Sequence, residues 1–297
     1  MESIFADPEV GHLDGLIDLD RYPLESPGSP EWTALTNLVR DRLELDGCAA
    51  LPGFLARDAL TRIAGDIATL AGHVVVRRQW SSVYSRDGLE SGWSLDDPRC
   101  RKSEWIAGHV TRDMIPPFAP AHRLYVSGYL KRFLAAVVGR HRIFEYADPL
   151  AGLVATVMPP GGWYPWHYDT NEFVVTIMLQ PAEAGGEFQY HQDLRSPGDE
   201  NLAGLLGVLT DNEPMSRRCA SFEPGDLQLF LGRYSLHRVT RVLGERARHV
   251  LVLSYADRPG IIGPVDRTRA VYGRVTEAHL VAEQASSPAL APDRLIL

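Results

Sequence analysis

The stretch that decides the fold is Trp166-His167-Tyr168-Asp169-Thr170-Asn171-Glu172-Phe173, which continues directly into Val174-Val175-Thr176-Ile177-Met178-Leu179-Gln180. Successive side chains of an extended chain point to opposite faces, so His167 and Asp169 share one side and Tyr168 faces the other. The apolar, β-branched run that follows predicts a buried strand. The stretch therefore sets an imidazole and a carboxylate together at the start of a strand.

The His-x-Asp pattern alone is weak, because ordinary composition produces it about once in a chain of this length. It occurs here at His12-Asp14, His167-Asp169 and His191-Asp193. The first and third copies lie in segments rich in Gly, Asp, Pro and Ser, which are typical of loops. Only the middle copy precedes a predicted buried strand, so we select it.

Composition is that of an ordinary globular protein. The 297 residues are 45% hydrophobic and 23% charged, and no apolar run approaches the roughly 18 residues of a membrane span. The start of the chain, Met1 to Asp7, lacks the basic and apolar regions of a signal peptide, so we expect a cytoplasmic protein without a membrane partner.

The net charge and the spacing of the cysteines argue against further classes of protein. A net charge of −8 gives no support to a nucleic-acid partner, because phosphate binding needs a basic face. Cys48, Cys100 and Cys219 are widely spaced and form no Cys-x-x-Cys pattern, which argues against a disulfide framework and a zinc knuckle.

The first half of the chain reads as a scaffold, residues 1–145. An irregular arm covers residues 1 to about 30. Helices are predicted from Ser29-Pro30 to Gly47, around the Leu60-Ile63-Ile67-Leu70 stripe, and from Ser127 to Gly139. Residues 79–120 show no clear period and predict a long loop region with short elements.

The second half reads as strands separated by turns. Strands are predicted at Leu153–Met158, Phe173–Gln180, Gly186–Tyr190, Leu227–Leu231 and His249–Tyr255. The fold class is therefore mainly β with flanking helices, with a sandwich or barrel as its core. The core spans residues 146–260, its insertion at 191–221 carries a helix that is either a lid or a cover, and residues 261–297 form a C-terminal extension.

A second histidine completes a candidate set of metal ligands. Pro224-Gly225-Asp226 predicts a turn before a strand, and a further short strand carries His237. Two imidazoles and one carboxylate, His167, His237 and Asp169, make a facial triad that leaves coordination positions open and favours Fe(II). A structural zinc site would be closed by cysteine or a fourth ligand.

An arginine indicates which kind of co-ligand would occupy the open coordination positions of the iron. Arg248 begins the apolar strand His249-Val250-Leu251-Val252-Leu253, where an unpaired cation is costly. A guanidinium forks onto a carboxylate, so Arg248 can hold the far end of a dicarboxylic acid whose keto-acid end chelates the iron. Arg246 has the same strand parity and is the rival, and a surface arginine pair is the alternative to both.

These residues, in this order, resemble the iron(II)/2-oxoglutarate-dependent dioxygenases, nearest a bacterial small-molecule branch related to free amino-acid hydroxylases and halogenases. The likeness rests on His167-Tyr168-Asp169-Thr170-Asn171-Glu172-Phe173-Val174-Val175-Thr176, on Gly185-Gly186-Glu187-Phe188-Gln189-Tyr190 and on Leu236-His237-Arg238-Val239-Thr240, and more weakly on Asp97-Pro98-Arg99 and Tyr146-Ala147-Asp148-Pro149-Leu150. It implies a double-stranded β-helix of the cupin, or jelly-roll, type, with Fe(II), 2-oxoglutarate and O2 as cofactors.

The resemblance also implies the reaction. Halogenases of this family replace the triad carboxylate by Gly or Ala, whereas this chain keeps Asp169, so we expect hydroxylation of an unactivated C–H of a free amino acid or related metabolite, with 2-oxoglutarate decarboxylated to succinate. Two features depart from the pattern: the aromatics of Gly161-Gly162-Trp163-Tyr164-Pro165, and Val250 where some branches have Ser after the arginine. The alternatives are a cupin-type metal protein or an iron oxygenase without 2-oxoglutarate and, less favoured, a halogenase.

Overall fold

The computed structural model describes residues 11–84, 93–94, 96–212 and 217–286. Its helices are α1 Pro30–Asp46, α2 Arg57–Ala71, α3 Pro120–Val126, α4 Gly128–Val137, α5 Leu202–Leu209, α6 Val265–Tyr272 and α7 Glu277–Ser286, with 3-10 turns η1 Pro98–Cys100 and η2 Arg112–Met114. Its strands are β1 Cys48–Leu51, β2 Arg77–Ser81, β3 Ser103–Val110, β4 Phe144–Glu145, β5 Leu153–Met158, β6 Tyr164–His167, β7 Val174–Gln180, β8 Ala184–Gly185, β9 Phe188–His191, β10 Arg218–Ala220, β11 Leu227–Phe230, β12 Leu236–Val239, β13 Val242–Leu243, β14 Arg248–Leu253 and β15 Tyr255–Ala256.

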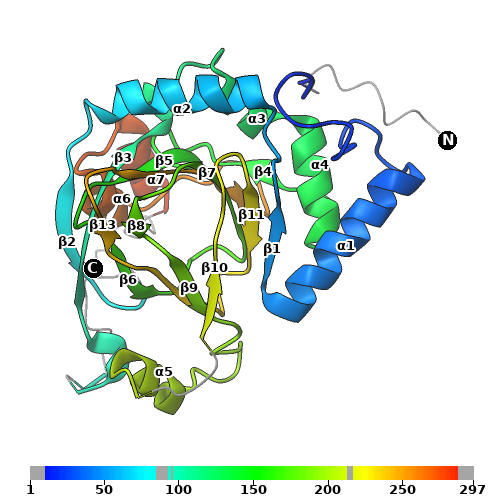
Figure 1. Ribbon diagram of the computed structural model, residues 1–297. Coiled ribbons are helices and arrows are strands. Elements are labelled where there is room, and N and C mark those ends of the chain that lie inside the picture. Colours follow the sequence, from blue (N-terminus) through cyan, green and yellow to red (C-terminus); the bar gives the residue numbers. More distant parts are fainter. Residues whose placement is uncertain (1–10, 85–92, 95, 213–216, 287–297) are drawn as a thin grey trace, which may run out of the picture.

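Two antiparallel sheets form the body of the described chain. The larger has seven strands in the order β1-β11-β7-β14-β5-β3-β2, and the smaller has four in the order β10-β9-β12-β6. Two further strand pairs, β13 with β8 and β15 with β4, form separate two-stranded sheets. Helix α2 crosses one end of the large sheet, α1 and α4 stand together beside it, and α5 lies at the opposite end of the molecule (Figure 1). The predicted fold class, mainly β with flanking helices, is confirmed.

The alternation of β14 shows how the two sides of the large sheet are filled. Leu251 and Leu253 belong to an extensive core that also contains residues of α1, α2 and α4. Val250, on the other side of the strand, packs in a second core with Phe188 of β9 and Phe230 of β11. Since this second core takes residues from both sheets, it lies between them, and its Phe188 and Phe230 rings lie beside His237 of the site described below.

Local signals produced the predicted helices. The Ser29 side chain accepts a hydrogen bond from the Trp32 amide, and Gly47, in the left-handed conformation with φ of 66°, ends α1. Ser127 caps α4 in the same way through the Leu130 amide. These predictions are confirmed, as is the helix at α2. No helix among the described residues is long and apolar enough to cross a membrane.

The long loop predicted over residues 79–120 is wrong in part. Ser103–Val110 form β3, which pairs with β5 inside the large sheet, and β2 pairs with β3 at its edge. Strand β3 has buried residues on both faces, including Trp105, Ala107 and Val110. Burial on both sides removes the alternation on which the prediction depended.

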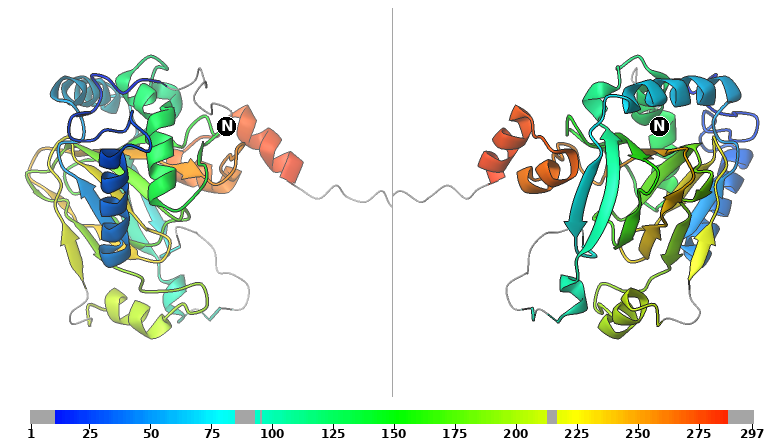
Figure 2. Two further views of the ribbon diagram at one scale, coloured as in Figure 1. Left: turned by 90° about the vertical axis from the view of Figure 1, so that its right-hand side faces the viewer. Right: turned by 60° about the vertical axis from the view of Figure 1, so that its left-hand side comes forward.

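The C-terminal extension is helical where the structure describes it. Helices α6 and α7 stand on one side of the body (Figure 2), and His279 of α7 is fully buried with Nε2 3.1 Å from Asp148 Oδ2. The same carboxylate accepts from the Gly263 amide at 2.8 Å. Asp148 therefore fastens the extension to the core. The tips of the predicted N-terminal arm and C-terminal tail lie outside the described residues.

Candidate metal centre

Strands β6 and β12 lie side by side and bring the two predicted histidines together. His237 pairs directly with His167 across the small sheet, and the register shifts before Val239 meets Tyr164. Pro165 and Trp166 therefore oppose Arg238 in a bulge, where a proline without an amide hydrogen is tolerated. The bulge lets Tyr164 and His167 both face the space between the sheets.

Asp169 follows β6 and turns back to the two imidazoles. Its amide donates to Gly232 O at 3.0 Å, and its carboxylate oxygens lie 4.0 Å from His167 Nε2 and 3.5 Å from His237 Nε2. The three ligand atoms all lie within 4.8 Å of one another, and this is the one such group among the described residues that could hold a metal ion. The copies at His12-Asp14 and His191-Asp193 do not form one.

The histidine tautomers suit a metal. His167 Nδ1 lies 2.8 Å from Pro165 O and His237 Nδ1 lies 3.0 Å from Ser235 O, so each ring donates its proton to a backbone carbonyl. Both Nε2 lone pairs then face Asp169, whose buried Oδ2 has no hydrogen-bond partner in the described structure. Three acceptors directed at one point repel each other unless a cation lies between them, so the donor set fits a metal.

Electrostatics favour the same protonation states. Burial lowers the pKa of His167 to about 4, with further lowering by His237. Burial alone would raise the pKa of Asp169, but the imidazoles of His237 and His167 bring it down to about 2. Near neutral pH the site therefore offers a neutral His167 and an ionised Asp169, as metal coordination requires.

The close approach of Gly232 to the carboxylate gives a testable prediction. A Cβ on Gly232 would lie 2.0 Å from Asp169 Oδ2 and 2.7 Å from Asp169 Cγ. Gly232→Ala must therefore displace the carboxylate, and we expect divalent-metal affinity to fall about 10- to 100-fold, the effect of disturbing a ligand's support. Calorimetric titration of the metal under argon measures it.

Gly65→Ala is the matched control, because nothing lies within 4 Å of a Cβ on Gly65 in α2. This variant should bind metal like the wild type. Unchanged affinity in Gly232→Ala would show that the carboxylate has room to move and that the close approach has no role in binding.

The structure separates the two arginines that the sequence left as rivals. Arg248 is buried, 7% exposed, its Nε has no partner among the described residues, and burial lowers its pKa to about 10. It shares a strand face with Val250, so it faces the space between the sheets. Arg246 is exposed and donates to Pro181 O at 3.0 Å. The geometry favours Arg248 as the carboxylate partner.

Sequence reasoning missed a pair of residues beside the candidate metal ligands. The Tyr164 ring is tilted against His167, with ring centroids 5.8 Å apart, and its hydroxyl lies 2.7 Å from Nε2 of the half-buried His109. His109 in turn meets Tyr272 of α6 edge-on at 5.5 Å. The aromatics before the triad were the available signal, but His109 belongs to β3, which was predicted as a loop.

A second missed residue is Arg267 of α6. Its charge contributes to the lowered pKa values of His167 and Asp169, after larger effects of burial and of the triad itself. It is exposed and has no carboxylate partner among the residues that the structure describes. No motif could identify it, because it lies in the extension far along the chain from the triad.

The insertion covers the outer side of the site. Tyr168 and Trp166, which face away from the ligands, pack with Leu205 and Val208 of α5. Arg195 lies over the Tyr168 ring at 4.1 Å. The insertion helix α5 therefore packs against the side chains of this segment that face away from the candidate ligands.

Solved structures of known proteins share this architecture. The carbocyclase SnoK of nogalamycin biosynthesis, described as non-heme and alpha-ketoglutarate dependent, has a TM-score of 0.53 at 14% identity, over 83% of this chain and 95% of its own. The epimerase SnoN, solved with Fe3+, alpha-ketoglutarate and nogalamycin RO, has a TM-score of 0.52 at 15% identity, over 76% and 84%.

The chain has the fold of the iron- and 2-oxoglutarate-dependent oxygenases. AviO1 from Streptomyces viridochromogenes Tue57 also matches the chain, with a TM-score of 0.50 at 18% identity over 77% of this chain and 98% of its own. No sequence model of a family matches the chain, and no curated protein sequence matches it. At these identities the likeness concerns the fold.

Proposed function

We propose that the protein is an Fe(II)- and 2-oxoglutarate-dependent dioxygenase that hydroxylates an unactivated C–H of a free amino acid or related small metabolite. The observation that carries the proposal is the convergence of His167, Asp169 and His237 with no proton donor between them among the described residues. The buried Arg248, whose Nε has no partner in the described part of the chain, adds to it. The two facing sheets are consistent with a double-stranded β-helix formed by residues 146–260, with residues 1–145 and 261–297 as its scaffold and extension.

Particular residues of the site would hold the iron and the 2-oxoglutarate. His167 Nε2, His237 Nε2 and the Asp169 carboxylate would ligate iron, and the Arg248 guanidinium would take the far carboxylate of 2-oxoglutarate. When bound, iron and 2-oxoglutarate supply O2 activation, with release of CO2 and succinate. The apolar residues packed between the sheets would exclude water from the bound groups.

The chain's own residues also position the substrate. The hydrogen bond between His109 and Tyr164 fixes an aromatic wall beside His167. Asp169 fills the coordination position that halogenases leave to a halide, which supports oxygen transfer. Arg267, an exposed cation near the triad, suits the carboxylate of an amino acid.

The direct test is turnover. The full-length protein, loaded anaerobically with Fe(II), is given 2-oxoglutarate, O2 and each common amino acid, and succinate and oxidised product are measured by mass spectrometry. We expect succinate above the uncoupled background with one amino acid or a few related ones. Binding of 2-oxoglutarate without stimulation by any amino acid would contradict the substrate class, and no 2-oxoglutarate binding at all would favour a cupin-type protein or a different iron oxygenase.

Arg267→Ala tests the substrate contact. Loss of a hydrogen bond between two charged groups costs about 1.5–3 kcal/mol, so we expect KM for the amino acid to rise about 10- to 150-fold with kcat nearly unchanged. Arg269→Ala is the matched control, because Arg269 is an exposed arginine of the same helix that lies 3.9 Å from Asp266. Equal KM values for the two variants would remove Arg267 from the substrate site.

A further inference from the structure

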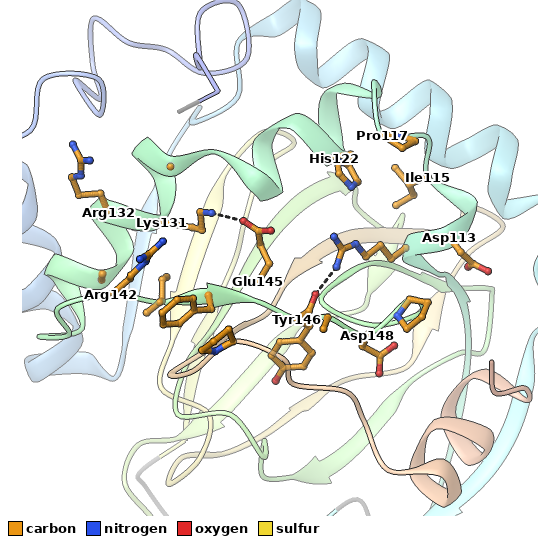
Figure 3. A pocket seen from close by; sticks show the side chains of 18 of the residues that line it. Asp113, Ile115, Pro117, His122, Lys131, Arg132, Arg142, Glu145, Tyr146 and Asp148 are labelled. Atoms are coloured by element: carbon orange, nitrogen blue, oxygen red, sulfur yellow. Dashed lines mark hydrogen bonds and ion pairs between the residues drawn. The ribbon is translucent and has the colours of Figure 1, made fainter. Parts of the chain in front are cut away.

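A second hollow lies away from the metal ligands. It has a volume of about 950 Å³ and lies between helices α3 and α4 and the segment around β4. Figure 3 shows Lys131, Arg132, Arg142 and His122 around it, with Glu145 between them. None of His167, Asp169, His237 or Arg248 lines this cleft.

The carboxylates of the cleft already have partners. Glu145 forms an ion pair with Lys131. Asp113 lies 2.8 Å from Arg274, and Asp148 is fully buried against His279 at 3.1 Å. Glu145 and Asp113 are therefore each paired with a cation, whereas Asp148 is held by hydrogen bonds to His279 and the Gly263 amide.

Three arginines of the cleft are not matched in this way. Arg112 donates to Tyr146 O at 2.5 Å and lies over the Tyr125 ring at 5.3 Å, and Arg142 lies over the Phe144 ring at 4.9 Å. Neither these two nor Arg132 has a carboxylate partner in the described part of the chain. These contacts orient Arg112 and Arg142 without neutralising them.

The excess of positive charge is local. The whole chain carries a net charge of −8, whereas the residues that line the cleft include four cationic side chains, Arg112, Lys131, Arg132 and Arg142, against the three carboxylates of Asp113, Glu145 and Asp148. Like charges held together repel each other, and the arrangement is stable at lower cost when an anion binds among them.

We propose that this cleft binds a small phosphorylated molecule. Guanidinium groups form paired hydrogen bonds with phosphate oxygens, and three such groups match a ligand with several negative charges better than a single carboxylate. The aromatic rings of Phe144 and Tyr146 and the ring of Pro259 supply apolar contacts for the rest of the molecule.

The cleft is separate from the metal centre. The Tyr146 backbone carbonyl accepts from Arg112 on the cleft side, while its hydroxyl donates to Asn171 Oδ1 at 2.6 Å, two residues beyond Asp169. In Figure 3 the Tyr146 ring points away from Lys131 and Glu145. A ligand in the cleft therefore does not occupy the space of 2-oxoglutarate, and the proposal stands or falls independently of the oxygenase activity.

The test uses inorganic pyrophosphate as the probe. Calorimetric titration into the full-length protein without added metal, at about 0.15 M salt to screen non-specific attraction, is expected to show saturable binding. The double variant Arg132→Ala/Arg142→Ala should raise Kd at least about tenfold, which corresponds to about 1.4 kcal/mol.

The control carries the same charge change elsewhere. Arg57→Ala/Arg101→Ala removes two exposed arginines that do not line the cleft, and its Kd for pyrophosphate should match the wild type. Circular dichroism confirms that all variants are folded. No saturable binding, or equal weakening in the two double variants, would overturn the proposal.

Discussion

His237→Ala is expected to abolish succinate formation and Fe(II) binding. His237 is 5% exposed, and its Nε2 lies 3.5 Å from Asp169 Oδ2. Disturbing the support of a ligand already costs 10- to 100-fold in metal affinity, so removing the ligand itself should cost more than about 100-fold. Anaerobic calorimetry with Fe(II) and mass spectrometry of succinate measure the two effects.

His249→Ala is the control for a buried histidine. His249 is 7% exposed and lies in β14, but alternation turns it to the side opposite Arg248 and Val250. It should keep Fe(II) affinity even if its stability falls. Wild-type turnover in His237→Ala would end the oxygenase proposal.

Arg248→Met should have the second large effect, on 2-oxoglutarate. Removing one partner of a buried, hydrogen-bonded charge pair costs about 2–5 kcal/mol, so we expect Kd for 2-oxoglutarate to rise by about 30-fold or more. The free protein should become more stable, because burial lowers the pKa of Arg248 to about 10 and shows that its charged form is disfavoured there. Titration of 2-oxoglutarate and thermal unfolding without ligand measure the two changes.

The two expected changes run in opposite directions, because 2-oxoglutarate binding weakens while the free protein becomes more stable. This combination makes the test specific. A purely structural arginine would lower stability when replaced, whereas a ligand-binding one stabilises the protein only when the ligand is present. Arg246→Met is the matched control, because Arg246 is exposed and its guanidinium bonds backbone carbonyls of Pro181 and Ala182. If Arg246→Met weakens 2-oxoglutarate binding and Arg248→Met does not, the two assignments must be exchanged.

Alternation and capping explain why much of the fold could be predicted. Ser29, Gly47 and Ser127 act on backbone groups within a few residues, so the ends of α1 and the start of α4 follow from short segments. The predicted strand at Leu153–Met158 is matched by β5. The prediction missed strand β3 because its two faces are buried by α2 and by the small sheet, which are distant in sequence.

The candidate site, like the fold, could be predicted from the sequence only in part. Sequence pattern alone selected His167 and Asp169, since an extended chain sets residues two apart on one face and an apolar strand follows them. It also identified His237 as a candidate metal ligand, and Arg248 and Arg246 as candidate partners of 2-oxoglutarate. Their roles as metal and 2-oxoglutarate ligands remain predictions, to be tested by the variants above.

Only the tertiary structure decided which distant groups meet. The pairing of His237 with His167, the burial of Arg248 against the exposure of Arg246, and the approach of Gly232 to Asp169 all depend on strand register. The nearness of Arg267 to the triad depends on the docking of α6 through Asp148. Register and docking are set by the packing of whole elements, so a local pattern can name such residues but cannot place them together.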